Sequence, residues 1–191
     1  MTATRPLVVG IGGSGRPGST TDQALTLALA GAEREGARTR LFDGVFLATL
    51  PLFLPWQDTR APQIAELLVA LTEADGLILA TPSYHGGVSA LVKNALDYLE
   101  DLRADYRPYL DGRAVGCVVT SAGRQAGGTT LSGLWSLVHA LRGWPTPLGV
   151  TVDTTQGADL AQYAGKLDMV GRQVAWFAQA AGRTTPVPVL R

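Results

Sequence analysis

The feature that most constrains the fold is an alternation, repeated five times, of a short apolar segment and a longer segment with helical periodicity. The apolar segments are continuous, as in strands buried on both faces of a parallel sheet. We expect strands at residues 7–12, 38–42, 76–80, 114–120 and 147–152. We expect helices at residues 21–35, 64–72, 88–102, 131–141 and 159–180. This alternation predicts an α/β fold with helices on both faces of one parallel sheet.

Length and composition favour one folded domain. The chain has 191 residues, of which 46% are hydrophobic and 17% charged, so it can bury a large core and wholesale disorder is excluded. We expect one domain over residues 1–181. The segment 182–191 carries two prolines and is expected to be an irregular tail.

Charge and residue counts exclude several functional classes. Sixteen basic and sixteen acidic residues give a net charge of zero, so we expect no nucleic-acid partner. The sequence contains no run of about 18 apolar residues, so we expect no membrane span. The first apolar run is too short for a signal peptide, so we expect a cytoplasmic protein. The chain has one cysteine, Cys117, so it cannot form an intrachain disulfide. With only two histidines besides, it cannot supply the four ligands of a structural Cys/His zinc site.

In parallel sheets, ligands bind at the carboxyl ends of the strands, near a switch in strand order. The loops at residues 12–19, 81–87 and 121–128 follow the first, third and fourth predicted strands. These three loops are therefore the candidate binding loops.

The first loop is rich in both glycine and hydroxyl groups. GxGxxG occurs twice, at positions 10/12/15 and 13/15/18, but a dinucleotide site also needs an acid about 20 residues on. The only candidate, Asp43, lies 28 residues beyond Gly15. No GxxxxGK[ST] motif is present. A phosphate monoester such as that of FMN suits the hydroxyl-rich set better, because short donors and helix amides can surround it. The alternative is a plain helix cap by Ser19 or Thr20. The hydroxyl and arginine side chains of the loop are Ser14, Arg16, Ser19, Thr20 and Thr21.

Three motifs in register resemble those of the NADPH-dependent FMN reductase family. Residues 81–99, TPSYHGGVSALVKNALDYL, are similar to the family's second motif, T-P-x-Y-N-G-x-x-P-G-x-L-K-N-A-x-D-W-L. The first motif, G-S-x-R-x-x-S, matches residues 13–19, and the third, G-x-x-x-G-G, matches Gly123, Gly127 and Gly128. The resemblance covers at least residues 7–150. It implies a flavodoxin-like three-layer fold with strand order 2-1-3-4-5.

The resemblance also implies which residues hold the cofactor. The FMN phosphate would be held by Ser14, Arg16, Ser19 and Thr20 or Thr21. The isoalloxazine would be lined, largely through backbone groups, by Pro82, Ser83, Tyr84, His85 and Gly86, and approached from the other side by Ser121 and Gly123. His85 stands where the family usually has Asn; it can tune the flavin, contact substrate or be a bystander on the loop.

The implied activity is an NAD(P)H-dependent FMN oxidoreductase. Hydride would pass from the nicotinamide to FMN N5 and then, in ping-pong order, to free flavin, a quinone, an azo compound or a pathway metabolite. Such a transfer needs no protein acid or base, so we assign no catalytic residue and no metal. The sequence does not distinguish NADPH from NADH as the hydride donor. The absence of an insertion between Tyr84 and Lys93 favours FMN that is held tightly rather than exchanged. A flavodoxin-like electron carrier and a dinucleotide-binding dehydrogenase are the alternatives; net charge zero argues against the carrier.

The segment 45–57 is unusually apolar for a loop, with Phe46, Leu52, Phe53, Leu54 and Trp56. Exposed apolar patches mark association sites, so we expect a homodimer or homotetramer formed through this segment. The alternative is that the segment folds back onto its own domain.

Overall fold

The structure, a computed structural model, describes residues 5–57 and 59–181, so the tail predicted at 182–191 lies outside the described residues. Five strands form one sheet in the order β2-β1-β3-β4-β5, and every neighbouring pair is parallel. This is the flavodoxin-like order, so the predicted fold class is confirmed. The strands are β1 (Leu7–Gly12), β2 (Arg38–Phe42), β3 (Gly76–Pro82), β4 (Ala114–Ser121) and β5 (Trp144–Asp153).

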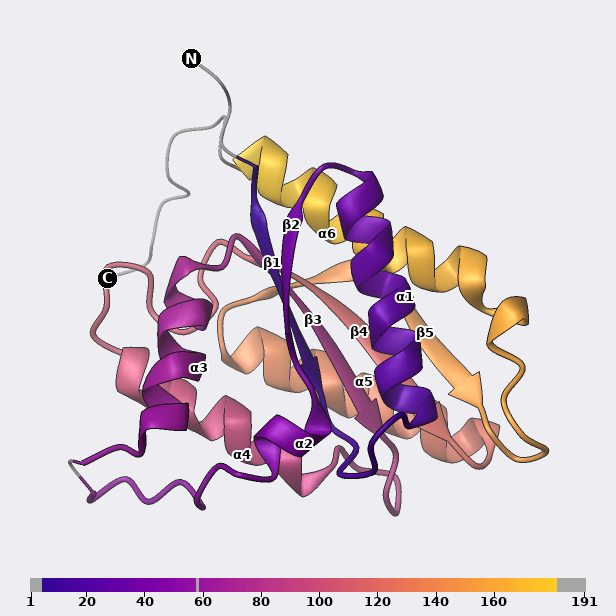
Figure 1. Cartoon of the computed structure of the whole chain (residues 1–191), viewed down its shortest axis with the longest axis horizontal. Coiled ribbons are helices and arrows are strands. Elements are labelled where there is room, and N and C mark those ends of the chain that lie inside the picture. Colours follow the sequence, from indigo (N-terminus) through magenta and orange to yellow (C-terminus); the bar gives the residue numbers. More distant parts are fainter. Residues whose placement is uncertain (1–4, 58, 182–191) are drawn as a thin grey trace.

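Helices cover both faces of the sheet, as Figure 1 shows. α1 and α6 pack on one face, and α3, α4 and α5 pack on the other. Among the described residues no helix is long and apolar enough to cross a lipid bilayer. The helices are α1 (Thr20–Arg34), α2 (Gly44–Leu47), α3 (Pro62–Glu73), α4 (Ala90–Asp97), α5 (Arg124–Ala140) and α6 (Ala164–Ala181), with 3₁₀ turns η1 (Tyr98–Leu102) and η2 (Leu160–Gln162).

The three central strands are buried along their whole length. This explains their continuous apolar sequences, because alternate side chains enter the cores on the two sides of the sheet. Val9 and Ile11 of β1 belong to the core beneath α3, α4 and α5, whereas Val8 belongs to the core beneath α1 and α6. The centre of the sheet is thus enclosed, whereas β2 and β5 at its sides are partly exposed. The loops extend from its carboxyl edge.

α1 and α6 cross in close backbone contact. A Cβ atom added to Gly171 would lie 1.8 Å from the carbonyl oxygen of Ala28, and one on Gly31 would lie 2.3 Å from that of Asp168. Any side chain at either glycine would force the two helices apart. The crossing fixes α1 against the sheet and therefore fixes the direction in which its first turn points.

Some predicted boundaries are wrong, each for a local reason. α5 begins at Arg124 rather than at residue 131, although its first turns contain Gly127 and Gly128, which disfavour helix in isolation. The predicted helix 88–102 is instead α4, capped by Ser89, followed by the 3₁₀ turn η1. The short helix α2, with its N-cap Asp43 bonded to the amide of Phe46, was not predicted.

Candidate functional site

The three candidate loops lie side by side at one edge of the sheet, because β1, β3 and β4 are neighbours. Backbone bonds continue from the strands into the loops: the amide of Gly13 donates to Ala80 (2.8 Å), and that of Ser83 donates to Thr120 (2.7 Å). The first and second loops are therefore fixed to the adjacent strands. Figure 1 shows this edge, where the ends of β1, β3 and β4 pass into α1, α4 and α5.

The first loop is clamped between two helices. A Cβ on Gly13 would lie 2.4 Å from Val92 of α4, and one on Gly44 of α2 would lie 1.7 Å from the carbonyl oxygen of Ser14. Ser14 is buried, and its hydroxyl accepts a long hydrogen bond, 3.4 Å, from the amide of Arg16. Arg16 itself is exposed. The glycines at 13 and 44 are thus required by close packing, and the loop backbone is held rigidly.

Ser19 is the N-cap of α1. Its hydroxyl accepts the amide of Asp22 at 3.1 Å, which confirms the capping interpretation of this residue. The amides of Thr20 and Thr21, in the first turn, have no acceptor within the helix and point out of its positive end. A capping hydroxyl still has its own proton to donate, so the cap and an anion-binding role are compatible.

Thr20 and Thr21 differ in orientation. Thr21 is buried, and its hydroxyl oxygen lies 2.7 Å from that of Thr120 at the end of β4. Thr20 is half-buried at the helix end. The sequence left open which of the two would hold a phosphate; the geometry favours the Thr20 side chain, with Thr21 able to contribute its amide.

The second loop is a tight two-residue turn. Tyr84 and Gly87 exchange two backbone hydrogen bonds of 3.0 Å, and His85 and Gly86 between them have φ of 54° and 79°. Positive φ at both central positions defines a type I′ turn, and it places the side chains of Tyr84 and His85 at the surface. Pro82, in contrast, is the buried last residue of β3.

The second loop is attached to α5 by Ser83. Its hydroxyl lies 2.7 Å from the hydroxyl oxygen of Thr130 and donates to the carbonyl of Ala126 at 3.2 Å. Thr81 secures the other end, because its hydroxyl oxygen accepts the amide of Ser89 at 2.9 Å. The Ser83 side chain is therefore used within the protein, and the turn offers a ligand mainly backbone groups and the side chains of Tyr84 and His85.

The third loop is shorter than predicted. Residues 121–128 were expected to be a loop, but α5 already begins at Arg124, so Gly127 and Gly128 lie in the helix. A Cβ on Gly127 would lie 2.6 Å from the Ser121 hydroxyl, which explains the glycine there. Ser121, buried at the end of β4, donates to the carbonyl of Gly123 at 2.8 Å, and Gly123 has φ of 120°. This conformation requires glycine.

Several supporting residues escaped the sequence analysis. Thr81, Ser89, Thr120 and Thr130 hold the loops through hydroxyl groups. Their only signal is a hydroxyl residue at a strand end or helix start, which is too common to single them out.

Charged and reactive groups around the loops limit the chemistry. Cys117 is fully buried in β4, and burial raises the pKa of its thiol to about 12, so it is not a nucleophile. The described residues contain no cluster of histidine, cysteine and acidic side chains suited to a metal ion. One oxygen of Asp22 is buried without a hydrogen-bond partner, beside Gly12. The arginine and histidine side chains that these loops and the start of α5 expose are Arg16, Arg124 and His85.

These features fit FMN. The helix end at Thr20, with Ser14 and Ser19 beside it, suits a phosphate monoester. The second and third loops present backbone and glycine, which allow the main chain to approach a flat ring. The type I′ turn is closed by the two backbone hydrogen bonds between Tyr84 and Gly87.

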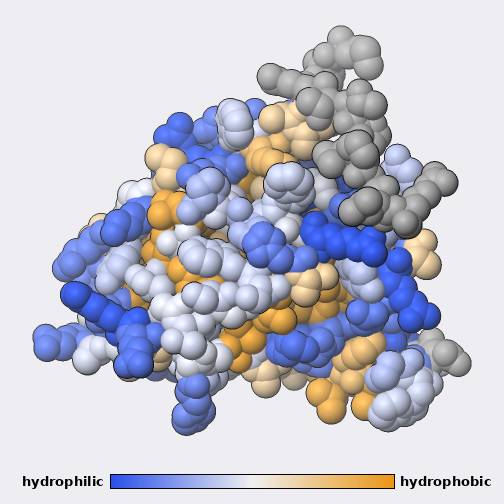
Figure 2. Space-filling view, turned by 180° about the vertical axis from the view of Figure 1, so that it is seen from behind, coloured by the Kyte–Doolittle hydropathy of each residue, from blue (hydrophilic) through white to orange (hydrophobic). Residues whose placement is uncertain are grey.

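The apolar segment 45–57 is partly folded back and partly exposed. Leu47, Leu50 and Phe53 pack into or against the core beneath α3, α4 and α5. Leu52 and Trp56, in contrast, are 71% and 73% exposed. Figure 2 shows the face formed by these helices, on which hydrophobic residues lie exposed among hydrophilic ones. Leu47, Leu50 and Phe53 thus follow the interpretation in which the segment folds back onto its own domain. Leu52 and Trp56 stay exposed, as the association interpretation requires.

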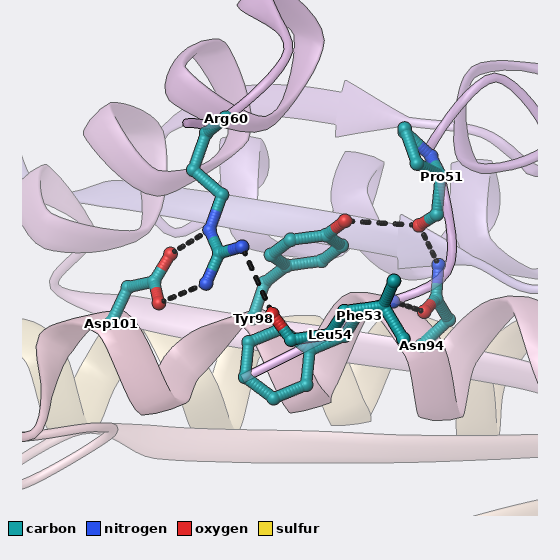
Figure 3. A network of polar contacts seen from close by, with 7 residues as sticks. All are labelled: Pro51, Phe53, Leu54, Arg60, Asn94, Tyr98 and Asp101. Carbon is teal, nitrogen blue, oxygen red and sulfur yellow. Dashed lines mark hydrogen bonds and ion pairs between the residues drawn. The ribbon is translucent and has the colours of Figure 1, made fainter. Parts of the chain in front are cut away.

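A polar network holds residues 51–57 and 59–60, which we call the strap, against α4 and η1 (Figure 3). The Asn94 side chain accepts the amide of Phe53 and donates to the carbonyl of Pro51, both at 2.8 Å. Arg60 forms a two-pronged ion pair with Asp101 at 2.7 and 2.8 Å. Its guanidinium also lies over the rings of Phe53 and Tyr98. The strap is thus an ordered element that carries Leu52 and Trp56.

Comparisons with known proteins show the family and the fold of the chain. A profile of the family described as NADPH-dependent FMN reductase matches residues 6–157. An iron-sulfur flavoprotein of Methanocaldococcus jannaschii is 33% identical over 129 residues, covering 64% of this chain and 66% of that protein. An FMN-dependent NADPH-azoreductase of Staphylococcus aureus is 36% identical over 89 residues, covering 47% of this chain and 42% of that protein. The chain thus spans two thirds or less of the length of these relatives.

Among solved structures, a WrbA-like flavodoxin from Agrobacterium tumefaciens superimposes with a TM-score of 0.65. The two are 20% identical, and the match covers 93% of this chain and 99% of that one. At this identity the likeness establishes the fold. The match of the family profile covers all five strands of the sheet and all three loops. The chain therefore belongs to the NADPH-dependent FMN reductase family.

Proposed function

We propose that the chain works as a single FMN-binding domain and catalyses NAD(P)H-dependent reduction of a small-molecule acceptor. The observation that carries this proposal is the anion-binding end of α1, with Ser14, Ser19 and Thr20, beside two rigid backbone-rich loops at the carboxyl edge of the sheet. Membership of the FMN reductase family supports the same cofactor and the same donor. The need for NAD(P)H favours a cytoplasmic location.

Each loop has a proposed task toward FMN. Ser14, Arg16, Ser19 and Thr20 bind the phosphate, with the Thr21 amide. Residues 82–86 line the ring on one side, and Ser121 and Gly123 approach it on the other. The chemistry that bound FMN supplies is acceptance of hydride at N5 and return of the electrons to a second substrate. The protein's part is to orient the ring and expose one face, so no side chain is assigned a catalytic proton transfer.

One exposed face favours a ping-pong order, in which the nicotinamide leaves before the acceptor binds. The acceptor we propose is a flat, electron-poor molecule such as free flavin, a quinone, an azo compound or a pathway metabolite. The azoreductase relative supports this class. The exposed Tyr84 and His85 stand on the turn that such a molecule would meet.

The iron-sulfur flavoprotein relative raises a second kind of redox centre, which this sequence does not favour. Iron-sulfur clusters are generally held by four cysteine thiolates. The 191 residues contain one cysteine, Cys117, and it is buried in the sheet. We therefore propose flavin chemistry without a cluster ligated by this chain.

The alternative is a flavodoxin-like electron carrier without NAD(P)H oxidase activity. Carriers that dock to basic partners are usually strongly acidic, whereas this chain has a formal net charge of zero. An absorbance spectrum of the purified protein, followed by anaerobic NADPH addition, separates the two. A flavin spectrum that NADPH bleaches supports the oxidoreductase. A flavin spectrum that neither NADPH nor NADH bleaches supports the carrier, and a protein that neither contains nor binds FMN contradicts both.

We further propose that the chain forms a homodimer or homotetramer through segment 45–57. Leu52 and Trp56 are exposed, and the polar network holds their neighbours Pro51, Phe53 and Arg60 against α4 and η1. Light scattering with size-exclusion chromatography tests this. The wild type is expected to be an oligomer at micromolar concentration, and the double variant Leu52→Ser/Trp56→Ser a smaller species. A monomeric wild type contradicts the proposal.

A further inference from the structure

The connection that follows β5 lies against the third loop at the same edge of the sheet. Asp153, the last residue of β5, is paired in register with Ser121, the last residue of β4. The backbone continues this pairing, since the amide of Thr154 donates to the carbonyl of Ser121 at 2.8 Å. From the sequence, ligand binding was expected only at the loops after β1, β3 and β4, and Asp153 was given no functional role.

The carboxylate of Asp153 is held in a defined orientation. Oδ1 accepts both the amide of Thr155, at 2.9 Å, and its hydroxyl, at 2.5 Å. These two bonds are the main reason that the pKa of Asp153 lies below its usual value. The positive charge of Arg124 and the amide of Gly123 lower the pKa further. Thr151, two residues before Asp153 and on the same face of β5, lies 3.5 Å from the position that a Cβ of Gly127 would take. The side chain of Asp153 therefore stands on the side of the sheet that carries α5.

The start of α5 lacks the groups that normally stabilise a helix N-terminus. Gly123 is the N-cap and has no side chain to accept an amide, and the first turn contains no acidic residue. A helix start is stabilised by a side-chain oxygen and by negative charge near its first amides. Asp153 is the acid that faces this helix start, and it comes from the neighbouring strand.

We propose that Asp153 is a positioning residue for the flavin site. Its negative charge beside the first turn compensates for the missing cap of α5 and so fixes Gly123, the residue of the third loop assigned to the flavin ring, and Arg124 at the start of the helix. This inference rests on the proposed function, because the flavin is what the loop would position. It adds β5 to the three strands whose loops form the proposed site.

Two substitutions at Asp153 test the proposal, with a matched control. Asp159 also accepts an amide two residues on, that of Ala161 at 3.1 Å, in the same connection after β5, but it caps η2. Asp153→Ala removes every interaction, Asp153→Asn keeps an oxygen that can accept from Thr155, and Asp159→Ala removes a similar bond in the same connection. Two readouts are compared: hydrogen exchange of the amides of residues 127–130 in the FMN-free protein, the first amides of α5 that have acceptors (Gly127 donates to Gly123 at 3.2 Å), and the Kd for FMN measured by flavin fluorescence.

For Asp153→Ala we expect faster exchange at residues 127–130 and FMN binding weakened about 3- to 5-fold, the scale expected for loss of a negative charge near a helix start. Asp153→Asn should fall between this variant and the wild type, and Asp159→Ala should match the wild type in both readouts. Unchanged exchange in Asp153→Ala, or an FMN Kd within twofold of the wild type, overturns the inference. Failure of the wild type to bind FMN at all contradicts the proposed function and the flavin role of Asp153 together. The exchange measurement then still reports whether Asp153 holds the loop.

Discussion

The hydroxyl oxygens of Thr21 and Thr120 lie 2.7 Å apart in a buried contact that joins the first turn of α1 to the end of β4. Thr21 is the neighbour of the half-buried Thr20 in the proposed phosphate seat, and Thr120 directly precedes Ser121 of the third loop. The two hydroxyl groups thus connect the phosphate-binding part of the site with the part assigned to the flavin ring.

This contact makes a specific prediction about paired substitutions. Thr120→Val or Thr21→Val alone leaves a buried hydroxyl without its partner, so each should lower the free energy of unfolding by about 1–3 kcal/mol. The double variant removes both polar groups and should cost clearly less than the sum of the single losses. Urea unfolding of the FMN-free proteins measures this. Additive losses would show that the two hydroxyl groups do not stabilise each other.

Ser19→Ala removes the cap of α1 and a proposed phosphate ligand together. We expect the free energy of unfolding to fall by about 1 kcal/mol, and FMN to lose affinity relative to riboflavin, which lacks the phosphate. Ser89→Ala is the matched control, because Ser89 caps α4 in the same way. It should reduce stability by a similar amount while leaving the preference for FMN over riboflavin unchanged. An equal loss of that preference in both variants would contradict a direct role for Ser19.

We expect Asn94 to contribute far more to the free energy of unfolding than its neighbour Lys93. Asn94→Ala leaves the amide of Phe53 and the carbonyl of Pro51 without their partner. The free energy of unfolding should therefore fall by about 1–3 kcal/mol. Lys93 makes an exposed ion pair with Asp97 four residues on, so Lys93→Ala should change it by at most about 0.5 kcal/mol. Urea unfolding of both variants gives the comparison, and equal effects would show that the strap does not depend on Asn94.

The Cys117 thiol should be inert in the folded protein. Burial raises its pKa from the model-compound value of 9.0 to about 12, so between these values the unfolded chain loses a proton that the folded chain keeps. Stability should therefore fall as the pH rises from about 9 towards 12, with a smaller decline in Cys117→Ala. At pH 8 a thiol reagent should react only at the rate of unfolding. Rapid labelling of native protein would show that the thiol is accessible.

Much of the fold follows from sequence because its signal is local. Continuous apolar runs such as residues 7–12 mark buried strands, and the glycine-rich turn between β1 and α1 marks a ligand-binding loop. The start of α5 could not be predicted in this way. Gly127 and Gly128 disfavour helix locally, and what fixes the first turns is packing of Gly127 against Ser121, a contact that needs the folded sheet.

The contact partners of individual side chains could not be predicted from the sequence either. Asn94 and Lys93 are adjacent in one motif, and only the structure shows that Asn94 holds a strap about forty residues away while Lys93 stays at the surface. Asp153 gave no signal either, because its importance depends on the register between β4 and β5. Long-range contacts of this kind leave no periodic pattern in the sequence.

The central claim is that the end of α1 is built for the phosphate of FMN. The most direct test is to titrate the flavin-free protein with FMN and with riboflavin under the same conditions. The account predicts that FMN binds about 100-fold or more tightly, because two or more hydrogen bonds to a charged phosphate distinguish the two ligands. Equal affinities for FMN and riboflavin would contradict it.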